Sequence, residues 1–403
     1  MSFRKTMILL LIGSLYNDII LYQEDIVITL PKMMLFPVIS ILGLILLFKK
    51  QIYMSKLSLR TTITLCGLLL FSLVFNREFS EYSFSIVQSI LIGIIYMFIL
   101  SSIIISTNKQ NTMSNLQFSL KVINICTFFN AMLGVFQSFT GLGFISERNF
   151  ILYGNLHRAQ GLLLDPNYFG QLMLFGLFIS IFLYKSEKNN LKYFCTLIIL
   201  LGIILSGSRS ALLMLFTTII FYTSVNKSLK TFIYSIAALI IISVTLAYFM
   251  PDQFENFMTI FNKDVYTGDI GRNSLEERSL LVAQAIEVGS LYWYKGVGVG
   301  NYVLYNDFHM FSHNTLAEMF AEYGVIGIMA FIGIFCLIPI KLFCQFKRQQ
   351  EAMLRSYCLV LLAIISYVLM SLTIVSYYSK FTFLLFALMI VMDDIMKRTR
   401  NEA

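Results

Sequence analysis

Long apolar runs separated by short polar links dominate the chain. A helix needs about 20 apolar residues to cross the core of a bilayer, and about a dozen segments approach that length. The pattern predicts spanning helices at roughly 7–22, 33–48, 61–76, 84–106, 121–140, 166–184, 193–207, 209–225, 231–249, 313–340, 356–376 and 381–396. We therefore expect an all-α polytopic membrane protein in which 1–403 form a single integral membrane domain of about 12 transmembrane helices.

Two of the links are long, and both fall on the side that we assign to the outside. They are the outer loop 141–165 and the large outer loop 250–312, which joins the ninth and tenth predicted helices. Loops of this length in a compact protein usually carry function. The second contains SLEERSLLVAQAIEVGS, where Ser274 and Glu277 have the spacing of a capping box. We expect an amphipathic helix here, lying at the membrane surface or between helices.

The distribution of charge gives the expected orientation. The chain is 58% hydrophobic and 13% charged, with a mean hydropathy of +0.77, whereas soluble proteins carry about a quarter charged residues. If the N-terminus is inside, most basic residues fall in inner links, which is the bias expected of a membrane protein. Both termini are therefore predicted to be cytoplasmic, and the net charge of +8 reflects orientation and not binding to nucleic acid.

The sequence offers no pattern for a cofactor. The six cysteines fall in or beside predicted spans, and none pairs with histidine at the spacing of a metal site. There is no Walker motif and no glycine-rich nucleotide loop. We expect no disulfide, no metal, no cofactor and an energy source other than ATP.

The stretch LSGSRSALL, residues 205–213, places an arginine inside a long apolar run. A charge at the bilayer centre costs about 2.5–3.5 kcal/mol or more, so we expect the run to break at Gly207 into two helices joined by an outer turn. Ser208 is a suitable N-cap for the second helix, and Arg209 would lie in its first turn. A helix N-terminus with an arginine can bind an anion; the alternative is an arginine that reaches lipid headgroups.

Three further outer segments carry polar groups that hydropathy does not require. In HRAQGLLLDPNYFG, Arg158 precedes Asp165, which is predicted either to cap the next helix or to take part in chemistry. EERSLL contains Arg278. In SHNTLAEMFAEYG, a cap at Ser312 would put His313 in the first turn of a helix, where the dipole favours a neutral imidazole that can accept a proton. Arginines suit diphosphate recognition, so these groups point to a phosphate-bearing substrate presented from the membrane.

These segments, in this order, resemble the bacterial O-antigen ligase and O-antigen or capsule polymerase family. SGSRSALL looks like the Ser-Arg motif of that family, and HRAQGLLLDPNYFG looks like its Arg-x-x-Gly and Pro-Asn segment. The stretch from EERSLL to GVGVGNYV resembles the large outer loop of the family, and HNTLAEMFAEYGVIG resembles the helix that closes this loop. The resemblance covers roughly 150–330. Leu316 departs from it, because an aromatic residue is expected at that position.

The resemblance implies a polytopic, metal-independent and inverting glycosyltransferase of the GT-C type. Its substrate would be an undecaprenyl-diphosphate-linked oligosaccharide at the outer face of the bacterial cytoplasmic membrane. Arg158, Arg209 and Arg278 would bind the donor diphosphate, and His313 would activate the acceptor hydroxyl, with Arg209 also counted as catalytic. The supporting and acceptor-side residues would be Asp165, Asn167, Asn314 and Glu318.

Three functions remain open at this point. A polymerase of O-antigen or capsular repeat units is favoured, because the sequence outside the shared segments is idiosyncratic. A ligase that transfers the glycan to a lipid A core or another acceptor is the main alternative, and a lipid-linked glycan flippase or transporter is a minor one. Expected partners are membrane lipids, a chain-length regulator and a flippase.

Overall fold

The computed structural model describes residues 2–16, 18, 20–22, 28–29, 43, 53, 55–75, 80–143, 152–153, 156–187, 190–226 and 269–402. The predicted spans 33–48 and 231–249 fall almost wholly outside the described residues, as does much of the large outer loop. The chain divides into two compact units. Unit 1 is Met1–Cys126 with Leu280–Ala403, and unit 2 is Thr127–Ser279.

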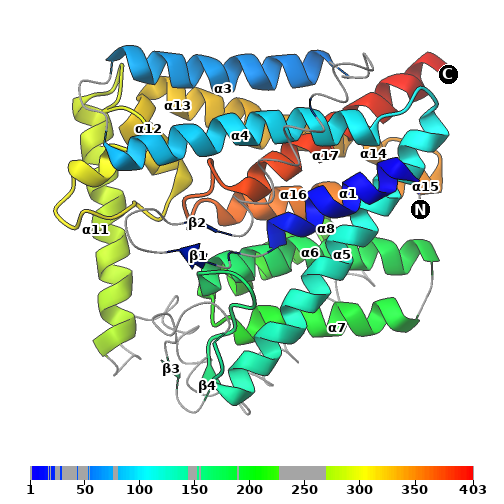
Figure 1. Ribbon diagram of the computed structural model, residues 1–403, viewed down its shortest axis with the longest axis horizontal. Helices are drawn as coiled ribbons and strands as arrows, with labels where there is room; N and C mark the ends of the chain where they lie inside the picture. The colour runs from blue at the N-terminus through cyan, green and yellow to red at the C-terminus, as the bar shows by residue number, and fades with distance from the viewer. Residues whose placement is uncertain are drawn as a thin grey trace. The chain divides into compact units, whose positions relative to one another are not determined.

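Unit 1 is built from helices that run side by side (Figure 1). Its helices before unit 2 are α1 (Phe3–Gly13), α3 (Lys56–Phe75), α4 (Glu81–Ile104) and the first part of α5 (Lys109–Thr140). Those after unit 2 are the later part of α11 (Asp269–Leu291), α12 (Thr315–Tyr323), α13 (Val325–Ala330), the π-helix η5 (Phe331–Leu337), α14 (Ile338–Lys347), α15 (Ala352–Ser356), α16 (Cys358–Met370) and α17 (Lys380–Glu402). Short 3-10 turns η1 (Ser14–Tyr16) and η4 (Tyr302–Leu304) and one antiparallel strand pair, β1 (Ile20–Tyr22) with β2 (Ile28–Thr29), complete its described elements.

Both termini lie at one end of unit 1 (Figure 1). Arg4 Nη1 donates to the carbonyl of Ile105 at 3.1 Å, and Lys109 Nζ pairs with Glu402 Oε2 at 2.7 Å. The start of the chain, its end and the link between α4 and α5 are therefore fastened together. This agrees with the prediction that the two termini share one side.

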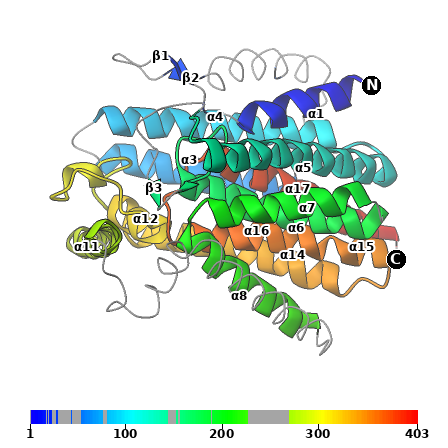
Figure 2. The same cartoon turned by 90° about the horizontal axis from the view of Figure 1, so that it is seen from below.

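The opposite end of unit 1 carries α11, which lies across the ends of the other helices in Figure 1 and is seen along its own axis in Figure 2. Its buried Ala285 and Val288 pack against Tyr302 and Ala321, and Tyr302 donates its hydroxyl to the carbonyl of Leu281 at 2.5 Å. A helix in the large outer loop was predicted, but Ser274 lies inside it and does not cap it. The helix starts earlier, at Asp269.

Unit 2 contains the turn predicted between two apolar helices. Its helices are the later part of α5, α6 (Pro166–Glu187), α7 (Asn190–Leu205) and α8 (Arg209–Asn226), and a strand pair joins β3 (Leu152–Tyr153) to β4 (Leu156–His157). Close approach between helices depends on glycine: a Cβ on Gly176 would lie 2.3 Å from the side chain of Thr127 on α5. A Cβ on Gly134 of α5 would lie 2.6 Å from the ring of Phe169 on α6.

Six helices are long and apolar enough to cross a membrane within the described ranges: Lys56–Phe75, Glu81–Ile104, Lys109–Thr140, Pro166–Lys185, Val325–Lys347 and Ala352–Met370. Three predicted spans are wrong in extent, and one of them is 121–140, whose helix already begins at Lys109. The segment 7–22 ends its helix at Gly13, and its last residues form β1. The segment 313–340 is divided at Gly324, whose φ of 63° is left-handed and breaks the helical path.

Candidate functional site

The turn between α7 and α8 has the conformation that the sequence predicted. α7 ends at Leu205, Gly207 has a φ of 60°, and α8 begins at Arg209. The Ser208 hydroxyl accepts a hydrogen bond from the Ala211 N–H at 3.4 Å, as an N-cap does. A glycine is needed at this position of the turn, because glycine alone adopts a left-handed φ without strain.

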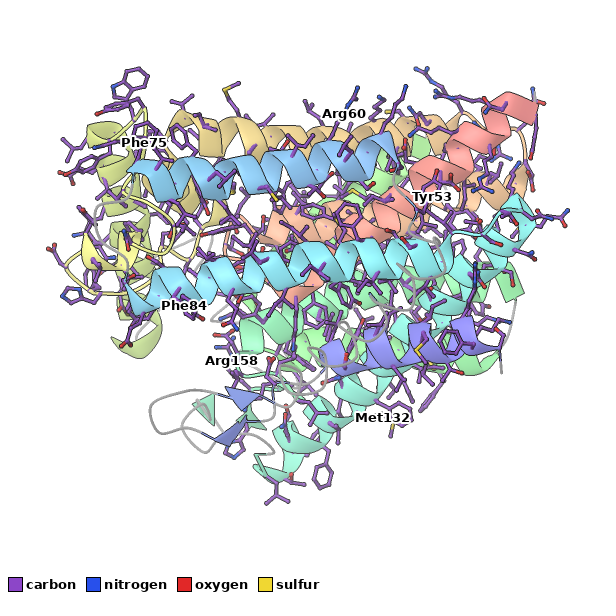
Figure 3. All side chains as sticks on the ribbon, turned by 45° about the horizontal axis from the view of Figure 1, so that its top comes forward. Tyr53, Arg60, Phe75, Phe84, Met132 and Arg158 are labelled. Carbon is purple, nitrogen blue, oxygen red and sulfur yellow. The ribbon has the colours of Figure 1, made fainter. Side chains whose placement is uncertain are left out.

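Arg158 lies against this turn and is held there by two acceptors (Figure 3). Its Nε donates to the carbonyl of Ser206 at 2.8 Å, and its Nη2 donates to Asn167 Oδ1 at 3.1 Å. The backbone N–H of Ala159 donates to the carbonyl of Leu205 at 2.8 Å. Only 7% of Arg158 is exposed. The structure therefore fixes a buried guanidinium beside the turn that leads into Arg209.

The loop after Arg158 is held by two amides of α5 that the sequence reading missed. Gln137 Nε2 donates to the carbonyl of Gly161 at 2.9 Å, and its Oε1 accepts from the Gly161 N–H at 2.7 Å. Asn130 Oδ1 accepts from the Leu162 N–H at 2.9 Å. Both amides are buried within an apolar helix, and that burial could have identified them, since polar groups inside a span need partners.

Asp165 acts as the cap of α6. Its Oδ1 accepts from the N–H of Asn167 at 2.6 Å and from the N–H of Tyr168 at 3.3 Å. This is one of the two roles that the sequence allowed. The same short segment thus orients Asn167 toward Arg158 and starts the helix behind it.

The other two predicted arginines are placed differently. Arg209 is the first residue of α8 and is half-buried. Arg278 lies on α11 and is also half-buried, and it makes no hydrogen bond or ion pair with any residue that the structure describes. The structure therefore unites Arg158, Asn167 and the start of α8, and it does not tie Arg278 to them.

In unit 1, His313 does not open a helix as predicted. α12 begins at Thr315, and its cap is Asn314, whose Oδ1 accepts from the Ala317 N–H at 3.0 Å. His313 precedes the cap with a φ of 55°, a left-handed value that is uncommon outside glycine. The argument from a first-turn position therefore does not apply to His313. The error has a local cause, because asparagine caps as well as serine.

Two buried contacts hold the loop around His313 in place. Glu318 Oε2 accepts from the Ser312 N–H at 2.7 Å, and the Thr315 N–H donates to the carbonyl of Ser371 at 2.8 Å. The residues on both sides of His313 are thus anchored to α12 and to the segment after α16. Strained backbone of this kind persists only where its surroundings fix it.

Glu318 and Glu322 are both fully buried. Their helix, α12, lies outside the six long apolar helices. Burial raises the pKa of Glu318 to about 7, although the hydrogen bond from the Ser312 N–H lowers this pKa. Burial and the charge of Glu318 raise the pKa of Glu322 well above its usual value. The second oxygen of Glu318, Oε1, has no hydrogen-bond partner among the described residues.

Glu322 has partners that sequence reasoning did not find. Its Oε1 accepts from the Gly300 N–H at 2.8 Å, and the Tyr377 hydroxyl donates to Oε2. Asn301 accepts from the hydroxyl of Ser83 at 2.6 Å. These contacts join α12 to the loop after α11, to α4 and to the segment before α17, so they depend on residues far apart in the sequence. Within the same described part of the chain, no group of three or more His, Cys, Asp or Glu side chains is placed to hold a metal ion.

The six apolar helices define an integral membrane protein. A sequence model of the family described as O-antigen ligase (Wzy_C) matches residues 194–332, about a third of the chain. Residues 194–332 are therefore similar to the O-antigen ligase domain family, and this similarity supports a role in glycosyl transfer during polysaccharide assembly. No curated protein matches the chain. The matched residues include Arg209, Arg278 and His313, whereas Arg158 precedes them.

Proposed function

We propose that this protein is a polymerase of undecaprenyl-diphosphate-linked oligosaccharide repeat units, building O-antigen or capsular polysaccharide at the outer face of the bacterial cytoplasmic membrane. The family supports glycosyl transfer, and the polymerase assignment rests on the idiosyncratic sequence outside the shared segments. The observation that carries the proposal is the guanidinium of Arg158, held by Ser206 and Asn167 against the start of α8.

In the proposed reaction, the arginines hold the diphosphate of the donor. The first N–H groups of a helix have no partner inside the helix, and its N-terminus carries a partial positive charge. Arg158 and Arg209 add two cations at the start of α8. Such an arrangement stabilises a leaving diphosphate as its charge develops. Arg278, on the loop helix α11, is a third candidate for this role.

The acceptor hydroxyl attacks the anomeric carbon of the donor sugar. A new glycosidic C–O bond forms, and the C–O bond to the lipid diphosphate breaks with its electron pair leaving on the diphosphate. The hydroxyl proton passes to the imidazole of His313, which acts as general base. Attack opposite the leaving group inverts the anomeric centre, and no step needs a metal. Glu318 and Asn314 position the loop that carries His313.

Charge and aromatic residues in unit 1 support the proposed orientation. The end that holds both termini carries Arg4, Lys109 and Arg398, and the α11 end exposes Trp293 and Tyr294. Basic residues favour the cytoplasmic side, and aromatic residues favour membrane interfaces. In a variant lacking native cysteines, Tyr294→Cys should react with an impermeant thiol reagent from outside, and Gln350→Cys only after permeabilisation. The reverse pattern would overturn the orientation.

The assay that tests the function uses purified protein with undecaprenyl-diphosphate-linked repeat units, followed by gel separation of chain lengths. A ladder of increasing length is expected. Transfer of one glycan to a lipid A core without a ladder would favour the ligase, which the description of the matched family makes the second candidate. Movement of the lipid-linked glycan across vesicles without bond formation would indicate a flippase. A chain-length regulator added to the assay should narrow the ladder.

A further inference from the structure

A groove of about 600 Å³ runs along unit 1 between α3 and the helical segment Val325–Lys347. Residues from Leu57 to Leu68 line it on α3, and residues from Ile326 to Leu342 line it on the other side. Eleven residues separate Leu57 from Leu68, so the groove extends about 17 Å along α3. Its wall is mostly aliphatic, and none of the residues proposed for glycosyl transfer lies in it.

Two glycines, which have no side chain, and an irregular helix leave this groove open. A Cβ on Gly67 of α3 or on Gly333 of η5 would meet no atom within 4 Å. Gly333 lies in the π-helix Phe331–Leu337, and the helix becomes regular again at α14, whose first turn contains Pro339. Ile63 and Met329 on the groove are 61% and 67% exposed. In a membrane these surfaces face lipid tails, which can enter the groove.

The charges of the groove lie at one end only. The helix α3 and the segment Val325–Lys347 run in opposite directions (Figure 1). Arg60, labelled in Figure 3, lies near the start of α3, and Lys341 lies on α14, so both line the same end of the groove. Both side chains are exposed, and neither forms an ion pair with a residue that the structure describes. The carboxylate of Asp393 also reaches this end, but it is paired with Lys397. The mouth of the groove therefore has an excess of positive charge.

We propose that this groove binds an anionic phospholipid, with an acyl chain between α3 and the segment Val325–Lys347 and the phosphate between Arg60 and Lys341. The aliphatic wall matches the chain and the two cations match the phosphate. Basic pockets between transmembrane helices on the cytoplasmic side are suited to anionic headgroups. The charged end is also the end that holds both termini (Figure 1), so the lipid would come from the cytoplasmic leaflet.

The lipid-linked substrate is a less suitable occupant on the same evidence. Under the proposed function its diphosphate lies at the outer face, whereas the cations of the groove lie at the opposite end of α3. The lipid site is therefore separate from the transfer reaction, and the test must be able to distinguish a phospholipid from a polyprenyl phosphate.

Native mass spectrometry of the purified full chain can measure binding of phosphatidylglycerol, phosphatidylcholine with the same acyl chains, and undecaprenyl phosphate. We expect phosphatidylglycerol to bind at least several-fold more tightly than phosphatidylcholine. The double variant Arg60→Gln with Lys341→Gln should lose this preference and keep its weak binding of phosphatidylcholine. Both positions are exposed, so the fold should be unaffected.

A second pair of variants fills the groove. Gly67→Leu and Gly333→Leu should each reduce binding of both phospholipids. Gly13→Leu on α1 is the matched control, because a Cβ there also meets no atom within 4 Å and lies outside the groove. Equal lipid binding by wild-type protein and all the groove variants would overturn the proposal. Preferential binding of undecaprenyl phosphate that the same substitutions abolish would overturn the phospholipid assignment.

Discussion

The arginine region of unit 2 and the histidine region of unit 1 hold their charged groups in different ways. Arg158 donates to two acceptors on other elements, the carbonyl of Ser206 just after α7 and the side-chain amide oxygen of Asn167 on α6. Glu318 and Glu322 are fully buried on a single short helix and accept hydrogen bonds from backbone N–H groups at residues 312 and 300. One region fixes a cation beside a helix start, and the other fixes a loop by means of buried carboxylates.

This difference suggests two roles: the arginine region binds the donor, and the histidine region positions the loop that carries His313. A cation at a helix N-terminus is not stabilised by the helix itself, and under the proposed function the anionic donor diphosphate offsets this cost. The carboxylates of α12 are enclosed by the protein: Glu318 holds the backbone next to His313, and Glu322 holds the loop at Gly300. We therefore expect substitutions in unit 2 to change donor affinity and substitutions around His313 to change turnover.

The largest effect is expected at His313. His313→Ala removes the proposed base, which is worth about 10²–10⁴ in rate, and should leave binding of the lipid-linked donor unchanged. Single-turnover rates and donor affinity would be measured on the same preparation. His309→Ala is the control, because His309 also has a left-handed φ, of 51°, in the same loop. Full ladders at the normal rate with His313→Ala would disprove the base assignment and make Asp165 the next candidate.

Replacing the arginines should weaken donor binding. Arg158→Lys keeps the charge but cannot donate to both Ser206 and Asn167, and hydrogen bonds of charged groups are worth about 1.5–3 kcal/mol. The dissociation constant for the donor should rise about tenfold to a hundredfold.

Arg209→Lys should lose most activity, because lysine keeps the charge but cannot make a bidentate contact with the diphosphate. Arg209→Glu should be worse than Arg209→Ala, since it would repel the diphosphate. The exposed Arg355→Lys serves as the control for handling and expression. If Arg158→Lys and Arg209→Lys bind the donor as tightly as wild type, the arginine region does not bind the donor and the proposed division between binding and turnover is wrong.

A smaller effect is expected at the turn itself. Gly207→Ala introduces a side chain at a φ of 60°, and its Cβ would lie 3.2 Å from Arg158 Nε. A left-handed residue costs about 1–2 kcal/mol, so the melting temperature should fall by a few degrees and donor affinity should fall with it. Gly202→Ala within α7 is the matched control, because its Cβ would make ordinary contact with Ala131 at 3.4 Å. A loss of stability as large in the control would contradict the explanation.

The smallest effect concerns pH and Glu318. The pKa of Glu318 in the folded protein, about 7, lies above its reference value of 4.5, so the folded state binds the proton more tightly than the unfolded state. This contribution to stability is complete below the reference pKa and is lost as pH rises through the folded pKa. Thermal unfolding between about pH 5 and about pH 8 should show a declining melting temperature in the wild type.

Glu318→Gln should have a shallower decline over the same range. The variant keeps an acceptor for the Ser312 N–H and cannot ionise. Because the charge of Glu318 also raises the pKa of Glu322, the difference between the two curves reports the ionisation of Glu318 together with its effect on Glu322. Identical slopes would show that Glu318 does not ionise in this range.

The parts of the site that depend on neighbouring residues could be predicted from the sequence. The turn at Gly207, the cap at Ser208 and the helix start at Pro166 behind Asp165 each depend on residues within about one helical turn. The apolar runs likewise predicted most of the observed long helices, although α5 begins well before the predicted span.

The rest depends on contacts between distant segments. Gly324 breaks the predicted span because Val325 N–H donates to the carbonyl of Trp293, and a Cβ on Gly324 would lie 2.3 Å from that oxygen. Tyr377 reaches Glu322 across 55 positions of sequence. Neither contact has a local pattern. His313 was misplaced for a local reason: two good capping residues, Ser312 and Asn314, lie two positions apart, and Asn314 is the one that caps α12.

The fastening of the two chain ends has a consequence for biosynthesis. Unit 1 consists of two stretches separated by the whole of unit 2, and its closing contacts, Lys109 with Glu402 and Arg398 with the carbonyl of Thr107, span 293 and 291 positions. Contacts of such separation form late, and domains generally fold in the order in which they are synthesised. Phe383 of α17 packs against α4 at Gly93. This face of α4 therefore stays without its partner in the membrane until α17 has been synthesised. A premature stop before α17 would leave the earliest helices without their partner.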